Sequence, residues 1–192
     1  MESELGGDAP WLAAAAGANA GLRAADRWRE VRTVERSGVR TITADGREVV
    51  HFASNDYLGL STHPAVVVAA VEATERWGAG AGSSRVVVGS RPSHDELEAG
   101  LADWKHAESA LLFPTGYQAN VGLLGALARL GFPGGPGVAI VSDELNHASI
   151  IDGARLARVP VAVFPHADAE AAATAVERLV VDGRRCVVVT DS

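Results

Sequence analysis

From residue 109 onward, short apolar runs alternate with segments in which apolar residues recur at helical spacing. The pattern predicts strands at 109–113, 138–142, 161–164 and 186–190, and helices at 117–130, 149–157 and 169–180. The predicted strands are almost uninterrupted hydrophobic runs, which is typical of strands covered on both faces. Because strands and helices alternate, right-handed crossovers are favoured. We predict an α/β fold, a mostly parallel sheet with helices on both faces.

The residues before 109 show a different pattern. Residues 1–21 are rich in alanine and glycine and are predicted to be a disordered tail, and the charged segment 22–36 is predicted to be a surface helix. Two β-type runs within 41–54, on either side of Asp45-Gly46, predict a hairpin. We expect domain ranges of 1–21 for the tail, 22–62 for an N-terminal arm and 63–192 for part of a larger domain.

Two helices are expected between the hairpin and residue 109. The first begins at Pro64, a favoured first helical position, and ends at Gly78. The second is predicted to open with a capping box formed by Ser93 and Glu96. The first carries one face at helical spacing, formed by Val67, Ala70, Val71, Thr74 and Trp77. In the second, Leu97, Leu101 and Trp104 are expected to point inward.

Composition narrows the class of protein. With 192 residues, 47% of them hydrophobic, the chain is long enough to bury a core. The net charge of -7 disfavours a nucleic-acid partner, because phosphate binding needs clustered Lys and Arg. A single cysteine excludes an intrachain disulfide, and no apolar run approaches the roughly 20 residues of a membrane span. We expect a cytoplasmic protein with no membrane and no nucleic-acid partner.

The segment "LLFPTGYQAN" contains a candidate anion site. A strand is predicted to end at Phe113, and a helix begins near Tyr117. The free amides of that helix N-terminus, near Gly116 and Tyr117, would face the carboxyl edge of the sheet and could bind a phosphate. Gly116 would let a ligand approach the backbone closely. The alternative is an ordinary strand-to-helix turn.

The segment "VSDELNHASIIDGARLA" contains a candidate site residue, His147, where a strand gives way to a helix. Ligands of open α/β sheets bind at such strand ends. His147 could stack on a planar ring, donate a hydrogen bond or act as an acid or base; alternatively it is a structural histidine bonded to Asp143. The other histidines, at 51, 63, 94, 106 and 166, have no metal-ligand spacing, so no metal site is expected.

The glycine-rich segment "GAGAGSSR" does not fit a dinucleotide site. Ser83 stands where the third glycine of G-x-G-x-x-G belongs, and the segment follows a predicted helix rather than a strand. No G-x-x-x-x-G-K-[ST] pattern occurs either. A nicotinamide-dependent dehydrogenase and a P-loop protein are therefore disfavoured.

Five motifs occur in the order found in one enzyme family: "SNDYLGLSTHP", "GAGAGSSRVVVGS", "HDELE", "LLFPTGYQAN" and "SDELNHASIIDGARLA". In these motifs the chain resembles the α-oxoamine synthases, pyridoxal phosphate (PLP) enzymes that join an amino acid to an acyl thioester. The resemblance implies that the chain is part of the large domain of a fold type I PLP-dependent transferase. It also implies that PLP is the cofactor and that the intact enzyme is a homodimer. The sequences of these motifs are most similar to those of the family branch that condenses L-alanine with pimeloyl-CoA or pimeloyl carrier protein in biotin synthesis, with loss of carbon dioxide.

The resemblance also implies roles for individual residues. Gly116 and Tyr117 match the backbone pair that holds the cofactor phosphate, and His147 matches the histidine that stacks on the cofactor ring and positions the substrate. Arg29 matches the arginine that binds the substrate carboxylate. Asn55 matches an active-site position near the dimer interface, within a segment that continues through Asp56 and Tyr57; Ser84 and Arg85 match the end of the family's glycine-rich loop.

Two departures from the family pattern affect the expected activity. The Schiff-base lysine has no counterpart, since the only lysine, Lys105, lies in a segment without a catalytic role in the family. Asp191 stands where the family usually has Glu. We therefore expect an N-terminal fragment that is inactive alone. The alternatives are a sister enzyme, such as glycine C-acetyltransferase or 5-aminolevulinate synthase, and a non-catalytic anion-binding module.

Overall fold

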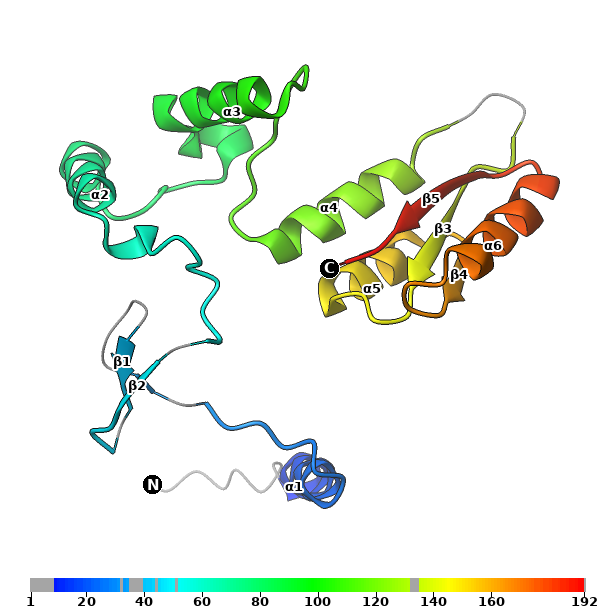
Figure 1. The fold of residues 1–192 in the computed structure, drawn as a ribbon, viewed down its shortest axis with the longest axis horizontal. Helices are drawn as coiled ribbons and strands as arrows, with labels where there is room; N and C mark the ends of the chain where they lie inside the picture. The colour runs from blue at the N-terminus through cyan, green and yellow to red at the C-terminus, as the bar shows by residue number, and fades with distance from the viewer. Residues whose placement is uncertain are drawn as a thin grey trace, which may run out of the picture. The chain divides into compact units, whose positions relative to one another are not determined.

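The computed structural model describes residues 9–31, 33–34, 40–43, 45–50, 52–131 and 135–191. The chain divides into two compact units, residues 1–88 and residues 89–192, and each is described by itself (Figure 1). The expected ranges of the arm and the larger domain, 22–62 and 63–192, remain predictions.

The first unit begins with a helix, α1 (Ala9–Ala24), where a disordered tail was expected over 1–21. That expectation is wrong for residues 9–21, because alanine has the highest helix propensity and the segment is rich in it; residues 1–8 lie outside the described residues. The helix predicted at 22–36 is also wrong. Helix α1 ends at Ala24, residues 27–31 have no regular structure, and positions 32, 35 and 36 are not described.

The predicted hairpin is confirmed. Strand β1 (Arg40–Ile42) pairs antiparallel with β2 (Glu48–Val50), with Thr41 opposite Val49. The turn closes through the Gly46 N–H, which donates to the Thr43 carbonyl at 2.8 Å. Gly46 has a φ of 80°, a conformation that glycine adopts without steric cost.

A short 3₁₀ turn, η1 (Leu60–Thr62), leads into α2 (Pro64–Trp77). The predicted start at Pro64 and stop at Gly78 are confirmed; Gly78 has a φ of 83° and its N–H donates to the Thr74 carbonyl. The face at helical spacing is not buried within this unit, because Val67 and Val71 are 46% and 52% exposed. Apolar periodicity identifies the face that can be buried, but it does not identify what covers it.

A π-helix, η2 (Arg85–Gly89), spans the boundary between the units, and α3 (Pro92–Lys105) follows. The helix starts one residue before the predicted Ser93 cap. Its N-cap is Arg91, whose N–H donates to His94 Nδ1 at 2.9 Å, so the imidazole takes the part expected of a Glu. The apolar face of α3 is not buried either, since Trp104 is 67% exposed.

The strand predicted at Ser109–Phe113 does not form. A strand requires a hydrogen-bonded neighbour, and none of the strands within the described ranges lies beside this segment. Its Leu112 N–H donates instead to Glu98 Oε1 at 2.7 Å. The prediction of a strand here is wrong.

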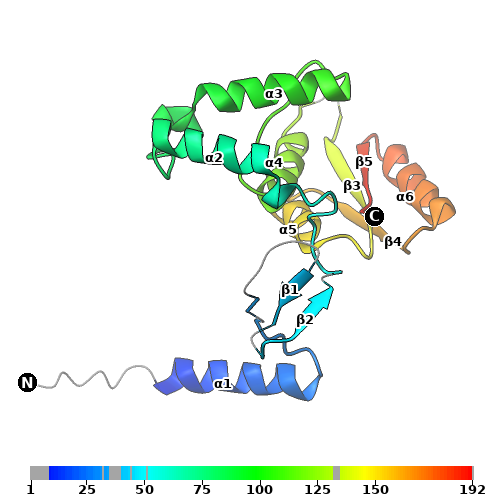
Figure 2. The ribbon, with the colours of Figure 1, turned by 60° about the vertical axis from the view of Figure 1, so that its left-hand side comes forward.

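The second unit contains a three-stranded parallel sheet in the order β4-β3-β5 (Figures 1 and 2). Its strands are β3 (Val138–Asp143), β4 (Val161–Phe164) and β5 (Arg185–Val189), and its helices are α4 (Gly116–Ala128), α5 (Ala148–Ala157) and α6 (Ala169–Val181). Figure 2 shows α4 and α5 on one side of the sheet and α6 on the other. The predicted strands, helices and mostly parallel sheet of residues 116–190 are confirmed.

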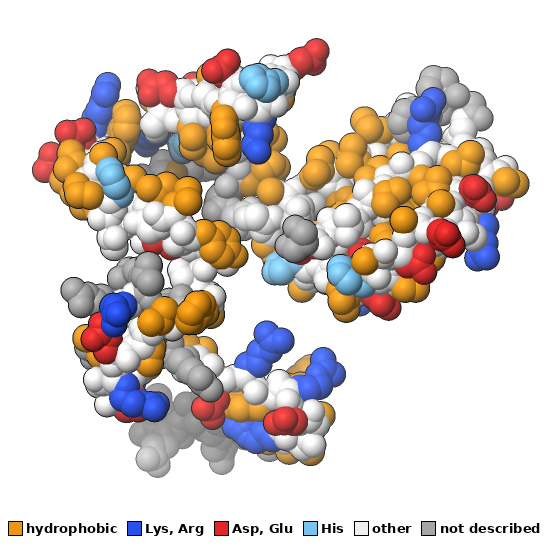
Figure 3. Space-filling view, viewed as in Figure 1, with side chains coloured by type: hydrophobic (Ala, Val, Ile, Leu, Met, Phe, Trp, Pro, Cys, Tyr) orange, Lys and Arg blue, Asp and Glu red, His pale blue; other side chains and the backbone are white. Residues whose placement is uncertain are grey.

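The core of this unit lies between α4, α5 and the central strand. All of β3 is buried, and Leu124, Ile140, Ile150 and Ala154 form the central cluster. Helices α4 and α5 approach closely at Gly153, where an added β-carbon would lie 3.0 Å from Leu124 Cδ1 and 3.2 Å from the Asn120 carbonyl oxygen. Many other hydrophobic side chains are exposed, as Figure 3 shows on one face. No helix in the described ranges is long and apolar enough to cross a bilayer.

Candidate functional site

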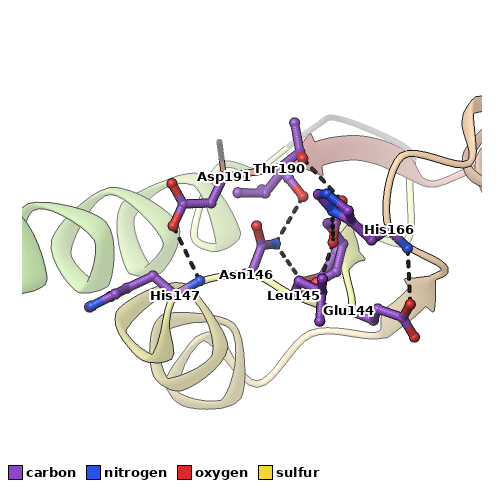
Figure 4. A network of polar contacts seen from close by, with 10 residues as sticks. Glu144, Leu145, Asn146, His147, His166, Thr190 and Asp191 are labelled. Atoms are coloured by element: carbon purple, nitrogen blue, oxygen red, sulfur yellow. Dashed lines mark hydrogen bonds and ion pairs between the residues drawn. The ribbon is translucent and has the colours of Figure 1, made fainter.

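The carboxyl ends of the three parallel strands carry a network of polar side chains (Figure 4). Central strand β3 ends at Asp143, a short turn follows, and His147 opens α5. His166 follows β4, while Thr190 and Asp191 follow β5. Parallel strands bring their carboxyl ends to one edge of a sheet, which is where ligands of open α/β folds bind. This edge is the candidate functional site.

His147 is the N-cap of α5, and its ring is fixed by hydrogen bonds. The Ser149 N–H donates to His147 Nδ1 at 3.1 Å, and the Ser149 hydroxyl lies 2.7 Å from the same nitrogen. Asn120 Nδ2 donates to that hydroxyl at 2.9 Å, so the hydroxyl donates onward to Nδ1. Because Nδ1 accepts, the neutral ring carries its hydrogen on Nε2. The alternative interpretation, in which His147 is bonded to Asp143, is wrong.

The N-terminus of α4 offers two free backbone donors. Thr115 caps the helix: its Oγ1 accepts from the Gln118 N–H at 3.1 Å and its carbonyl accepts from the Ala119 N–H at 3.0 Å. The N–H groups of Gly116 and Tyr117 have no acceptor among the residues described. A β-carbon added at Gly116 would meet nothing within 4 Å, and Gly116 is not in the left-handed region. The two amides therefore remain available to bind an anion, and Gly116 has no side chain that would crowd it.

Hydrogen bonds join the N-terminal halves of α4 and α5. The Tyr117 hydroxyl donates to Asp152 Oδ2 at 2.7 Å, and this hydrogen bond raises the pKa of Tyr117 above its ordinary value. Asn120 reaches Ser149 and through it His147. The structure thus brings together three of the residues expected to form the site: Gly116, Tyr117 and His147.

Asp143, His166 and Thr190 form a cluster that the sequence did not predict. The Asp143 carboxylate is buried and accepts from the Leu145 N–H at 2.9 Å, from His166 Nδ1 at 3.0 and 3.1 Å and from the Thr190 hydroxyl at 3.1 Å. The Leu145 N–H, followed by His166 and Thr190, holds the pKa of Asp143 below its ordinary value. Each residue ends or follows a neighbouring strand, which is the sequence signal that could have found the cluster.

Asn146 and Asp191 complete the edge. Asn146 is buried, and its Nδ2 donates to Ser142 Oγ at 2.9 Å and to the Val189 carbonyl at 3.0 Å. Its Oδ1 is buried with no donor in the part of the chain that the structure describes. Asp191 Oδ2 accepts from the His147 N–H at 3.3 Å. The orphaned oxygen marks a place where a further donor is needed.

Two other expected site residues, Arg29 and Asn55, lie in the unit of residues 1–88. Arg29 is exposed in a segment without regular structure, and Asn55 Oδ1 accepts from the Tyr57 hydroxyl at 3.5 Å. Between Asn55 and Tyr57, Asp56 is bonded to Ser61, which lowers the pKa of that carboxyl. The grouping of Arg29 and Asn55 with His147 remains a prediction.

Metal binding has no structural support within the described ranges, where no group of three or more His, Cys, Asp or Glu side chains is placed to hold an ion. His51, one of the histidines considered in the sequence, lies outside those ranges. The chemistry that the described residues can perform is anion binding by the two α4 amides, contact of a planar group with the exposed His147 ring, and hydrogen-bond donation from its Nε2.

The family model for aminotransferases of class I and II matches residues 47–192. The chain belongs to this family. Within the aminotransferase family it is 45% identical over 150 residues to an 8-amino-7-oxononanoate synthase of Thermoanaerobacter pseudethanolicus, covering 78% of this chain and 36% of that protein. It is 50% identical over 157 residues to the enzyme of the same name from Mycobacterium sp. strain JLS, covering 82% and 39%. The chain thus spans about two fifths of the length of these curated relatives.

A solved member of the α-oxoamine synthase group shares the fold. Serine palmitoyltransferase from S. paucimobilis, solved with a bound PLP-myriocin aldimine, matches with a TM-score of 0.75 and 25% identity over 97% of this chain and 45% of that one. The fold type I assignment and the resemblance to α-oxoamine synthases are therefore confirmed for this aminotransferase-family chain.

Proposed function

We propose that this chain provides part of the cofactor and substrate site of an 8-amino-7-oxononanoate synthase. This PLP-dependent acyltransferase condenses L-alanine with pimeloyl-CoA or pimeloyl carrier protein and releases carbon dioxide, a step of biotin biosynthesis. The observation that carries the proposal is the identity of 45% and 50% to curated enzymes of this name. We further propose that the intact enzyme is a cytoplasmic homodimer.

The residues at the sheet edge fit PLP, a planar pyridine ring that carries a phosphate. The Gly116 and Tyr117 amides would hold the phosphate, because they are free and point out of the positive end of the α4 dipole. The missing side chain of Gly116 leaves the space that the phosphate oxygens need. The exposed His147 ring would contact the face of the pyridine.

When bound, PLP supplies an electron sink that stabilises a carbanion at the α-carbon of the amino acid. The protein's contribution is orientation. His147 is fixed by Ser149 through Nδ1, so Nε2 can donate a hydrogen bond toward a substrate oxygen without moving the ring. A fixed donor reduces the entropy lost on reaching the reactive geometry. In this proposal Arg29 binds the substrate carboxylate and Asn55 contacts the substrate.

The lysine that such an enzyme uses to hold its cofactor covalently is not among these residues. Lys105, the only lysine, lies in the last turn of α3, with Nζ 4.3 Å from the centre of the Trp104 ring. We propose that the reactive lysine belongs to a part of the protein outside residues 1–192.

The proposal is tested by assaying the full-length protein with L-alanine and pimeloyl-CoA and measuring CoA release. We expect turnover on the order of 1 per second or faster. A polypeptide of these 192 residues alone, as a control, should show none, because it lacks the lysine. Turnover only with glycine and acetyl-CoA, or with glycine and succinyl-CoA, would replace this proposal with a sister enzyme. PLP binding without turnover on any pair would favour a non-catalytic module.

A further inference from the structure

We propose that Asp143, His166 and Thr190 form a positioning cluster that fixes the turn carrying His147. The inference rests on the proposed function, because His147 needs an exact place only if it contacts a bound cofactor. None of the three residues would touch the cofactor or the substrate. His166 and Thr190 would act by holding Asp143 in place at the start of the turn.

The cluster joins all three strands at the site edge. Asp143 ends central strand β3, His166 lies two residues beyond β4, and Thr190 directly follows β5. One buried carboxylate therefore receives hydrogen bonds from the loops on both neighbouring strands. Such a carboxylate is stabilised only where its acceptor sites are filled, so the three loops are held in one arrangement.

The turn from Asp143 to His147 is tied down along its length. The Leu145 N–H donates to the Asp143 side chain and the Asn146 N–H to the Asp143 carbonyl. Asn146 Nδ2 then reaches the Val189 carbonyl on β5, and the His147 N–H reaches Asp191. Losing the bond between Asp143 and Thr190 would loosen the same strand end that anchors Asn146 and His147.

The direction of the bond from His166 suggests a matched pair of variants. An ionised carboxylate only accepts, so His166 donates from Nδ1, and its ring, 47% exposed, leaves Nε2 outside the cluster. In His166→Asn the amide nitrogen takes the place of Nδ1 and keeps the donor. His166→Ala removes it. Thr190→Ser and Thr190→Val form a second pair that keeps or removes the hydroxyl.

The first test reads the His147 ring without cofactor. In the full-length protein labelled with ¹⁵N-histidine, the NMR shifts of a fixed ring show one tautomer, with Nδ1 unprotonated and Nε2 protonated. We expect His166→Ala and Thr190→Val to shift the His147 signals toward the average of the two tautomers, while His166→Asn and Thr190→Ser leave them in place. The control is His94, which also accepts a backbone N–H through Nδ1 but lies on α3; its signals should not move in any variant.

The second test measures PLP affinity by fluorescence titration. We expect His166→Ala and Thr190→Val to weaken binding about tenfold, and their conservative partners to remain within about twofold of the parent. Unmoved His147 signals and parental affinity in both deletion variants would overturn the inference while the proposed function stands. A shift of His94 together with His147 would also overturn it, because it would indicate general loosening. A parent protein that binds no PLP would overturn the proposed function itself.

Discussion

Replacing Gly153 with alanine tests whether the close approach of α4 and α5 shapes the site. The new methyl carbon would lie 3.0 Å from Leu124 Cδ1 and 3.2 Å from both the Asn120 carbonyl oxygen and Val121 Cα. Two of these neighbours are backbone atoms, so the helices must separate by a few tenths of an ångström. Overpacking of this kind costs about 1–3 kcal/mol. Alanine stabilises a helix by about 1 kcal/mol relative to glycine, so the free energy of unfolding should fall by about 1 kcal/mol in all.

Gly125→Ala is the matched control, because Gly125 lies in α4 with nothing within 4 Å of an added β-carbon. It should gain the propensity of about 1 kcal/mol without the steric cost. The free energies of unfolding of the two variants, from urea titration, should therefore differ by about 2 kcal/mol, or about 4–8 °C in Tm.

Gly153→Ala should also weaken PLP binding, because separation of the helices strains the contact between Tyr117 and Asp152. The fluorescence titration that measures this should show Gly125→Ala close to the parent. Equal stabilisation by both substitutions would refute the argument that backbone contact at Gly153 sets the distance between the helices.

Three further predictions concern single site residues. Gly116→Val should weaken PLP binding about tenfold or more, equivalent to about 1.4 kcal/mol. Tyr117→Phe keeps its backbone amide, so its effect on PLP affinity should be small. Equal PLP affinities of both variants and the parent in a fluorescence titration would place the phosphate elsewhere. His147→Phe should retain PLP but lose about 100-fold in kcat, because the flat ring remains and the fixed Nε2 donor is lost; steady-state kinetics would contradict this if kcat were unchanged or PLP were lost. The pKa of Asp143 is lowered in the folded protein, so its contribution to stability is present above its unfolded pKa of about 3.9 and is lost as the pH falls through the folded pKa. The free energies of unfolding of the parent and of Asp143→Asn, measured by urea titration, should therefore differ less below about pH 4.

The sequence predicted residues 116–190 well because each strand there is an apolar run with a neighbour in the same unit. It failed at Ser109–Phe113 for the complementary reason, since an apolar run becomes a strand only beside a partner. It also failed at residues 9–21, where alanine and glycine together suggested low complexity although alanine favours helix. The pattern of apolar residues describes only the local preference of a segment for strand or helix. The error at Ser109–Phe113 arose because strand pairing decided the structure, and the error at residues 9–21 arose because the helix propensity of alanine did.

At the site, backbone geometry was easier to predict than side-chain partners. The free amides at Gly116 and Tyr117 follow from the start of a helix after the Pro114-Thr115-Gly116 turn, which is visible in the sequence although the strand expected before that turn does not form. The strand-end positions of Asp143 and His166 are visible, but their pairing was not predicted, because the two lie 23 positions apart and the parallel register of β3 and β4 brings them together. The Ser93 cap failed because His94 can fill the role of an acidic side chain.

The cap that His147 forms on α5 limits which residues can replace it. Ser, Asp or Asn would supply an oxygen for the Ser149 N–H and preserve the helix start, but they offer no ring. Phe or Tyr would preserve a flat surface and leave that N–H without its acceptor, at a cost of about 1 kcal/mol. One imidazole serves the helix with one nitrogen and leaves the other available to a ligand. A library of all twenty residues at position 147, sorted separately for folding and for catalysis, should therefore yield two lists that share histidine alone.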